Sequence, residues 1–227
     1  KKFKIKYVTY LYMLPIKNTN EIKNKINMEK KLQIDSTKTT VDDIDDIEEI
    51  TKSKESIKNM YSKEYSEFIP IFGGIHMSRI LSKSGEVLSM KPEPFFVLDL
   101  SIPENNKSPS LIDCMNLYCE KESLDGENAW FNEKTNSKQD VYKQVVFWSL
   151  PSVMIIDLKR FNAMGRKLQV PVDIPIDNLD LSDYVYGYDK TTYIYELYGI
   201  CNHMGSTLGG HYTAFVKNAN GKWYSYN

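Results

Sequence analysis

The stretch at positions 209–227, GGHYTAFVKNANGKWYSYN, has the pattern of a β-hairpin that begins near a histidine and ends on an asparagine. Residues 212–216 alternate aromatic, small and branched side chains, as strands do. Residues 218–221 have the Asn and Gly content of a tight turn. Residues 223–226 are rich in aromatic side chains, which is typical of a return strand. The stretch therefore predicts two antiparallel strands joined by a short polar turn.

The predicted hairpin brings His211 close to Asn227. If the turn is symmetric about Ala219, the two residues face each other directly, with Cβ atoms roughly 5 Å apart. An imidazole N–H that donates to the amide oxygen has one fixed tautomer and one free nitrogen, which a general base requires. The spacing also fits a plain polar pair on a solvated hairpin, so both interpretations stay open from the spacing alone.

The composition is that of a globular protein with balanced charge. The chain has 227 residues, enough for one large or two small domains. Its 29 basic and 30 acidic residues give no electrostatic reason to expect nucleic-acid binding. No apolar run reaches the roughly 18 residues of a membrane span. Three cysteines without paired spacing fit a reducing compartment. We therefore expect a monomer in the cytoplasm or nucleus, with no membrane contact.

The chain divides into two parts that differ in composition. Residues 1–64 are rich in charge, with an acidic run at 42–49, and we interpret them as a partly disordered insertion or linker in which only residues 3–10 alternate like a strand. Residues 65–227 carry a helix pattern capped by Ser110 and several apolar strand patterns. These strands are expected near residues 95–103, 145–150, 153–158 and 193–201. The fold class predicted for this part is α+β, mainly antiparallel β.

Several short strings in this second part occur in an order that matches a known family. They are IFGG at 71–74, EPF at 93–95, LDLSIP at 98–103, WSLP at 148–151, IIDLKRF at 155–161, YELYGI at 195–200, NHMG at 202–205, GGHYTAF at 209–215 and WYSYN at 223–227. In this order they resemble the catalytic domain of the ubiquitin-specific proteases, the papain-like deubiquitinating cysteine peptidases. The resemblance implies the papain-like fold of that family, with palm and fingers present and the thumb largely missing.

The resemblance also implies roles for particular residues. His211 would be the catalytic base that activates a cysteine thiolate, and Asn227 would orient its ring. Substrates would be ubiquitin or ubiquitinated proteins. The expected enzyme is a ubiquitin carboxyl-terminal hydrolase.

Five further residues would bind the C-terminal tail of ubiquitin. Gly209 and Gly210 would allow close backbone approach to that tail, and Tyr212 and Phe161 would wall its channel. His203 is assigned either to substrate contact or to a structural hydrogen bond. A third histidine, His76, is expected to be structural.

The chain departs from the family pattern at its zinc-binding positions. The family often carries two Cys-x-x-Cys pairs on its fingers, but this chain has LSKSG at 81–85 and FNEKT at 131–135. Without thiolates at these positions we expect no structural zinc and no other cofactor.

The second departure is the nucleophile. The family's Gly-Asn-Thr-Cys string is absent, and none of Cys114, Cys119 and Cys201 stands where the nucleophile should be. Covalent catalysis needs that thiolate. We therefore expect this chain to be the C-terminal part of a longer enzyme, inactive alone, with the cysteine upstream. The alternative is a catalytically inactive ubiquitin-binding or scaffold module of the same fold.

Overall fold

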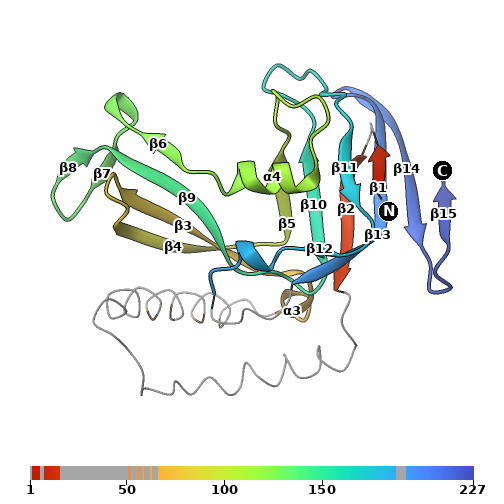
Figure 1. Cartoon of the computed structure of the whole chain (residues 1–227), viewed down its shortest axis with the longest axis horizontal. Helices are drawn as coiled ribbons and strands as arrows, with labels where there is room; N and C mark the ends of the chain where they lie inside the picture. The colour runs from red at the N-terminus through yellow and green to blue at the C-terminus, as the bar shows by residue number, and fades with distance from the viewer. Residues whose placement is uncertain are drawn as a thin grey trace.

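A computed structural model describes residues 2–5, 8–15, 66–187 and 193–227, together with four isolated helical positions, Thr51, Glu55, Lys58 and Ser62. Two larger sheets lie at opposite ends of the molecule, and a helix lies between them in this view (Figure 1). The strands are β1 Lys2–Ile5, β2 Val8–Pro15, β3 Gly74–Ser82, β4 Val87–Phe95, β5 Val97–Ser101, β6 Glu122–Leu124, β7 Trp130–Asn132, β8 Ser137–Gln139, β9 Val141–Ser149, β10 Met154–Lys159, β11 Val172–Pro175, β12 Leu179–Asp180, β13 Ile194–Ser206, β14 Gly209–Lys217 and β15 Trp223–Tyr226. The helices are α3 Ile69–Phe72 and α4 Leu111–Tyr118, with 3-10 turns η1 Gly126–Asn128 and η2 Ser182–Tyr184.

The larger sheet has seven strands and carries the predicted hairpin at one edge. Its order is β15-β14-β13-β2-β10-β5, and β12 pairs with β13 beside this path. The pairing is antiparallel except between β10 and β5, which run parallel. β2 lies in the middle, with β13 on one side and β10 on the other.

One face of this sheet is buried because its apolar residues alternate. On β10, Met154, Ile156 and Leu158 are buried, whereas the residues between them are half-buried. Side chains of successive strand residues point to opposite faces, so one face packs into the core and the other stays partly open. Helix α4 packs against β5 and β11, and its buried residues Leu111, Cys114 and Met115 join this core.

The smaller sheet has four strands in the order β4-β3-β9-β6, with the β7–β8 hairpin beyond it at the far end of the molecule (Figure 1). Phe95 of β4 and Phe147 of β9 belong to the same buried cluster as the core of the larger sheet. Their ring centroids lie 5.8 Å apart in an edge-to-face arrangement, a favourable geometry for aromatic pairs. Buried aromatic packing therefore joins the two sheets.

The predicted helix cap is confirmed. The Ser110 hydroxyl accepts from the Asp113 backbone N–H at 3.2 Å, and the Asp113 carboxylate accepts from the Ser110 backbone N–H at 2.7 Å. This reciprocal pair is a capping box, which satisfies two backbone donors at the start of a helix. The helix that follows this cap ends at Tyr118.

The start of the protein corrects the predicted domain boundary at residue 65. The composition predicts that residues 8–15 belong to the charged insertion, but they form the central strand β2 of the seven-stranded sheet. Residues 2–5 form β1, which pairs with β11. These first strands therefore belong to the folded domain. The remainder of the predicted insertion at 16–50, including the acidic run, lies outside the described residues.

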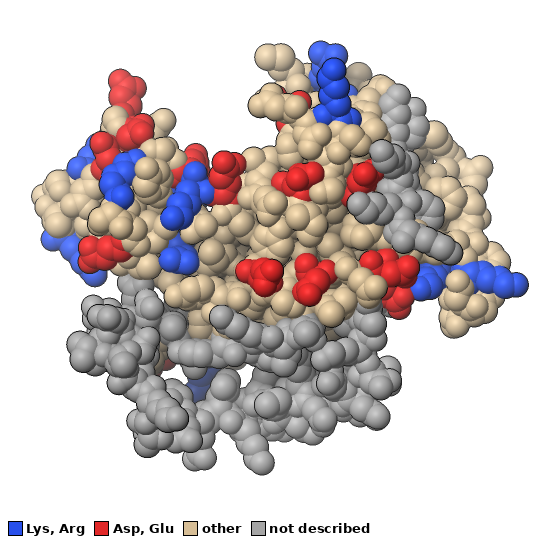
Figure 2. Space-filling model, viewed as in Figure 1, with Lys and Arg blue, Asp and Glu red and all other residues tan. Residues whose placement is uncertain are grey.

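Charges of both signs are interspersed on the face shown in Figure 2. Basic and acidic side chains alternate over the end that carries the four-stranded sheet, and acidic side chains lie across the middle (Figure 2). This visible face therefore offers no continuous basic tract among its described residues for a phosphate backbone. Within the described residues, no helix is long and apolar enough to cross a membrane.

Candidate active site

The hairpin of β14 and β15 forms as predicted, but in a different register. Lys217 pairs with Trp223, and Ala214 pairs with Tyr226. The connecting residues 218–222 are therefore centred on Asn220, and Gly221 adopts a φ of 76° there. This register places Asn227 level with Thr213. The predicted direct opposition of His211 and Asn227 is wrong because the turn is centred one residue later than Ala219.

His211 and Asn227 nevertheless meet, because two residues along a strand return to the same face. A diagonal pair of this kind remains within reach of longer side chains. His211 Nε2 and Asn227 Oδ1 form a hydrogen bond, and both side chains are exposed at the sheet edge. The amide oxygen can only accept, so Nε2 carries the proton and Nδ1 of the neutral ring is left with its lone pair. The pair thus has the geometry of a base and its orienting residue.

Three other predicted site residues gather on the opposite face of β13 and β14. His203 is directly opposite Tyr212 in the register, whereas His211 is opposite Met204. The His203 and Tyr212 ring centroids lie 4.6 Å apart, and the Phe161 ring centroid lies 5.9 Å from that of His203. His203 is only 5% exposed, while Tyr212 is 57% exposed. The structure therefore brings Phe161, His203 and Tyr212 together, on the face that does not carry His211.

Lys167 contacts the aromatic cluster formed by Phe161, His203 and Tyr212, and no sequence pattern predicts this contact. Its ammonium lies 3.1 Å from His203 Nδ1, donates to the His203 carbonyl, and lies 5.5 Å from the centre of the Phe161 ring. Burial and then the charge of Lys167 lower the pKa of His203. Burial and then nearby Arg160 lower the pKa of Lys167 itself. No local motif marks this lysine, because its partner lies 36 residues away in the chain.

The two neighbouring glycines occupy different environments. A Cβ on Gly210 would lie 2.3 Å from His203 Nε2 and 2.5 Å from the Met204 carbonyl oxygen, so close packing within the chain requires glycine there. Gly209 has a φ of 152°, and a Cβ built on it would meet nothing within 4 Å. Only Gly209 therefore faces open space, where another backbone can approach closely.

None of the three cysteines is placed to act with His211. Cys114 is fully buried, and burial raises its pKa to about 11; burial does the same to Cys119. Cys201 is half-buried on β13, and burial raises its pKa as well. It pairs with Ala214, so it shares the face of Tyr212 rather than that of His211. His211 therefore has no thiol partner among these residues.

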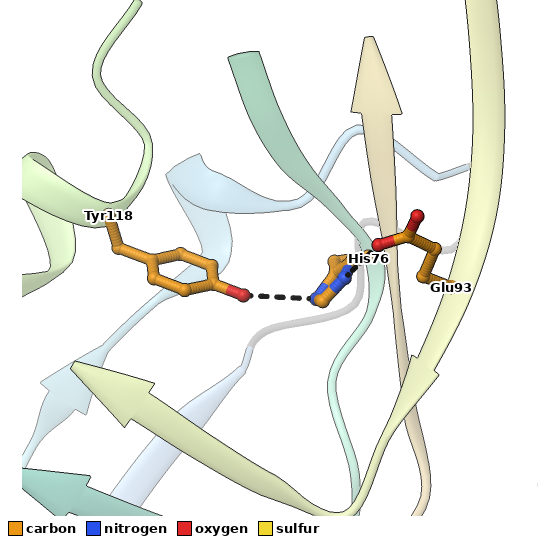
Figure 3. Close-up of polar contacts among 3 residues, drawn as sticks. All are labelled: His76, Glu93 and Tyr118. Carbon is orange, nitrogen blue, oxygen red and sulfur yellow. Dashed lines mark hydrogen bonds and ion pairs between the residues drawn. The ribbon is translucent and has the colours of Figure 1, made fainter. Parts of the chain in front are cut away.

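His76 is held by hydrogen bonds on both ring nitrogens (Figure 3). Nε2 lies 3.2 Å from a Glu93 carboxylate oxygen, and Nδ1 lies 3.1 Å from the Tyr118 hydroxyl. The ring also stacks on Phe95, with centroids 5.6 Å apart. These contacts connect β3, β4 and α4, which is the structural role expected for this histidine.

The two positions where the family often binds zinc contain turns closed by hydroxyl and amide side chains. In the first, the Ser82 hydroxyl accepts from the Glu86 N–H at 3.0 Å. In the second, Asn132 Oδ1 accepts from the Lys134 N–H at 2.9 Å. Zinc prefers thiolates and imidazoles arranged tetrahedrally, so these residues do not fit a zinc site. No group of three or more candidate metal ligands occurs within the described residues.

The mainly antiparallel fold and the His211–Asn227 hydrogen bond resemble those of a cysteine-peptidase scaffold, and comparison with known proteins gives the family. The profile of the ubiquitin carboxyl-terminal hydrolase family matches residues 10–227. The chain is 39% identical over 139 residues to Ubiquitin carboxyl-terminal hydrolase 8 of Arabidopsis thaliana, covering 56% of this chain and 16% of that protein. It is 38% identical over 129 residues to Ubiquitin carboxyl-terminal hydrolase 15 of Homo sapiens, covering 55% and 13%.

The chain is also similar to solved structures of deubiquitinase (DUB) modules. The chain superposes on the SAGA Ubp8/Sgf11/Sus1/Sgf73 DUB module bound to ubiquitin aldehyde with a TM-score of 0.62 and 28% identity, covering 78% of this chain and 42% of that one. A second structure of the module, with a substituted Ubp8 and a shortened Sgf11, gives a TM-score of 0.63 and 29% identity, covering 76% and 39%. The chain belongs to the ubiquitin carboxyl-terminal hydrolase family and has the papain-like fold of the ubiquitin-specific proteases. It spans only 13% to 16% of the length of the two curated relatives above.

Proposed function

We propose that this chain is the C-terminal part of a deubiquitinating thiol isopeptidase and supplies the base His211 and its orienting residue Asn227. The observation that carries the proposal is the His211–Asn227 hydrogen bond, which leaves Nδ1 as the basic nitrogen of an exposed ring. The nucleophilic cysteine lies upstream of Lys1. Ubiquitin or ubiquitinated proteins are the substrates, the protein is a monomer of the cytoplasm or nucleus, and no zinc or other cofactor takes part.

In the proposed reaction His211 acts first as a base and then as an acid. Nδ1 takes the thiol proton, and the thiolate attacks the carbonyl carbon of ubiquitin's last glycine. When the tetrahedral intermediate collapses, the C–N bond breaks and the protonated ring gives its proton to the departing lysine amine. Water then attacks the thioester with His211 again as base, which releases the ubiquitin carboxylate and the thiol. Asn227 holds the ring in the required tautomer throughout.

Exposed apolar side chains next to the aromatic cluster support binding of a protein substrate. Met164 is 94% exposed and Leu208 is 99% exposed. Their loops approach each other, because a Cβ on Gly165 would lie 3.6 Å from the Thr207 hydroxyl. Exposed apolar side chains brought together on neighbouring loops can contact a protein partner. Together with half-exposed Tyr212, they offer ubiquitin an apolar contact at the entrance to the proposed tail channel.

Activity of the longer gene product that includes the upstream cysteine tests this function. It should cleave a fluorogenic ubiquitin C-terminal substrate, and His211→Ala should abolish cleavage. His76→Gln is the matched control, since it changes a structural histidine of the other sheet and should retain activity. Thermal unfolding of each variant separates loss of chemistry from loss of fold. Full activity of His211→Ala would end the proposal.

The alternative function is a catalytically inactive ubiquitin-binding or scaffold module. It is favoured by the placement of the cysteines, because none of them faces His211 and burial raises the pKa of each. A longer product that binds ubiquitin and shows no cleavage would establish this alternative. Cleavage that depends on both His211 and an upstream cysteine would exclude it.

A further inference from the structure

The turn that joins β14 and β15 contains Asn220–Gly221, the only Asn–Gly pair in the sequence. An asparagine followed by glycine is prone to deamidation, because glycine has no side chain to hinder a close approach of its backbone nitrogen. Both residues are exposed, so solvent water reaches them. The same turn sets the register that brings Asn227 to His211. A chemical change in this turn can therefore affect the candidate active site.

Deamidation of this pair needs no reactant other than water. The Gly221 nitrogen attacks Asn220 Cγ, the new N–Cγ bond closes a cyclic imide, and the Cγ–Nδ2 bond breaks. The proton lost by the Gly221 nitrogen passes through solvent to Nδ2, which leaves as ammonia. Water then opens the imide. Cleavage at Cγ gives aspartate, whereas cleavage at the main-chain carbonyl gives isoaspartate, in which Cβ has become part of the main chain.

The folded turn holds the attacking nitrogen and both polar atoms of the carboxamide. The Gly221 N–H donates to the Asn218 carbonyl at 2.8 Å. Asn220 Oδ1 accepts from the Lys222 N–H at 3.0 Å, and Nδ2 donates to the Tyr224 hydroxyl at 2.8 Å. Attack on Cγ requires the Gly221 nitrogen to leave its acceptor and the carboxamide to turn. Because these hydrogen bonds must break first, the native turn opposes the reaction.

Strand β15 depends on this turn for its position. It has four residues, lies at the edge of the seven-stranded sheet (Figure 1) and, within the described sheet, pairs with β14 alone. Its last ladder pair is Ala214–Tyr226, and Asn227 follows directly. An extra main-chain carbon at residue 220 lengthens the connection, and a shift in register changes which side chains share a face. Isoaspartate at this position therefore moves Asn227 relative to His211.

We propose that Asn220–Gly221 is a deamidation site protected by the Tyr224 hydroxyl, and that isoaspartate formed there separates Asn227 from His211. The modification accumulates with time, since water is the only co-reactant, and the added main-chain carbon persists through unfolding and refolding. Its effect on cleavage rests on the proposed function above, whereas the reaction itself and the change at His211 do not.

Timed incubation of the 227-residue chain at neutral pH tests the protection. Mass spectrometry of a peptide that spans the turn measures the loss of the amide, and an isoaspartyl methyltransferase assay measures the isoaspartate. Tyr224→Phe deletes only the hydroxyl and should deamidate about three- to tenfold faster than the wild type, because one hydrogen bond that holds the carboxamide is lost. The matched control Tyr226→Phe changes the other tyrosine of the same strand and should react at the wild-type rate. The urea-unfolded chain should react fastest.

Equal rates for the folded and the urea-unfolded wild type would overturn the protection without any variant. Thermal unfolding shows whether Tyr224→Phe is folded. A folded Tyr224→Phe that reacts at the wild-type rate would overturn the role of the hydroxyl, and so would an equal acceleration by Tyr226→Phe.

Side-chain NMR of the aged protein tests the effect on the site. Ion exchange separates the product, because a neutral amide has become a carboxylate. His211 should carry its proton on Nε2 in the wild type and should lose this pattern in the isoaspartate form, whereas His76 on the other sheet should be unchanged. Asn220→Asp is the matched control, since it adds the same charge without lengthening the main chain and should keep the His211 signal.

An unchanged His211 in the isoaspartate form would refute the link to the active site. An equal change in Asn220→Asp would refute the part played by the longer main chain. In the longer gene product, the isoaspartate form should lose ubiquitin cleavage and Asn220→Asp should retain it. If the wild-type product does not cleave, the proposed function fails, but the deamidation rates and the His211 spectra still decide this proposal.

Discussion

Asp157 and Asp99 face each other on the parallel strands β10 and β5, and Tyr10 of β2 is the register partner of Asp157 on its other side. Burial and then the Asp99 carboxylate raise the pKa of Asp157 from 3.8 to about 6, against the opposing effect of Lys159. Because Asp99 and Asp157 are paired on neighbouring strands, their carboxylates repel each other when both are charged. The folded protein therefore carries an electrostatic penalty at neutral pH, which a neutral side chain at position 157 should remove.

The direction of the pH effect follows from the raised pKa. The folded state binds the Asp157 proton more tightly than the unfolded chain does, so this group favours folding fully only below the unfolded pKa of 3.8. That contribution is lost as the pH rises through about 6. The whole shift corresponds to about 3 kcal/mol. Because Asp157 is only half-buried and water screens it, we expect about 1–2 kcal/mol.

Asp157→Asn should therefore be more stable than the wild type by about 1–2 kcal/mol at pH 7.5 and nearly equal to it at about pH 4. Urea unfolding followed by tryptophan fluorescence at both pH values measures the difference. Asp177→Asn, which changes an exposed aspartate, is the matched control and should show no such pH-dependent gain. An Asp157→Asn variant that is destabilised at pH 7.5, or that gains equally at both pH values, would refute the electrostatic argument.

Three further substitutions probe the fold and the glycine at the site. Ser110→Ala removes the helix cap and should cost about 1 kcal/mol in urea unfolding, whereas Ser110→Asp should retain most of the stability. Tyr195→Phe deletes a buried hydroxyl that donates to the Pro151 carbonyl at 2.8 Å, and a loss of about 1–2 kcal/mol is expected by the same assay; an unchanged midpoint would contradict this. Gly210→Ala adds a Cβ only 2.5 Å from the Met204 carbonyl oxygen, so the strands must shift, and a fall in melting temperature corresponding to about 1–3 kcal/mol is expected by calorimetry.

The sequence was sufficient for the class of fold and for the meeting of His211 with Asn227, because alternation and turn residues act over short distances. It was insufficient for the register, because Asn and Gly occur at several positions of the turn and each arrangement is locally plausible. Only the structure shows that Gly221 takes the positive φ and that the turn is centred on Asn220. The contact survived this error because a diagonal pair shares a face, as an opposed pair does.

The remaining features that the sequence does not predict depend on contacts between residues far apart in the chain. Lys167 meets His203 across 36 residues, and nothing in the surrounding loop distinguishes this lysine from other surface lysines. The charged residues after β2 predict a linker there, yet β2 pairs with β13 and β10, which lie far along the chain. Local composition describes neighbours in the sequence and cannot reveal which distant strands will pair.

The central position of β2 also makes the protein divisible in an unusual way (Figure 1). The chain donates its eight-residue strand Val8–Pro15 to the middle of a sheet whose other members all come after residue 95. If the backbone were cut between Pro15 and Ser66, the first fragment would carry β1 and β2, and the second would hold an incomplete sheet with a gap to receive β2. Mixing the two would then amount to strand complementation, and exchange of labelled first fragments would report how often the sheet opens at its centre.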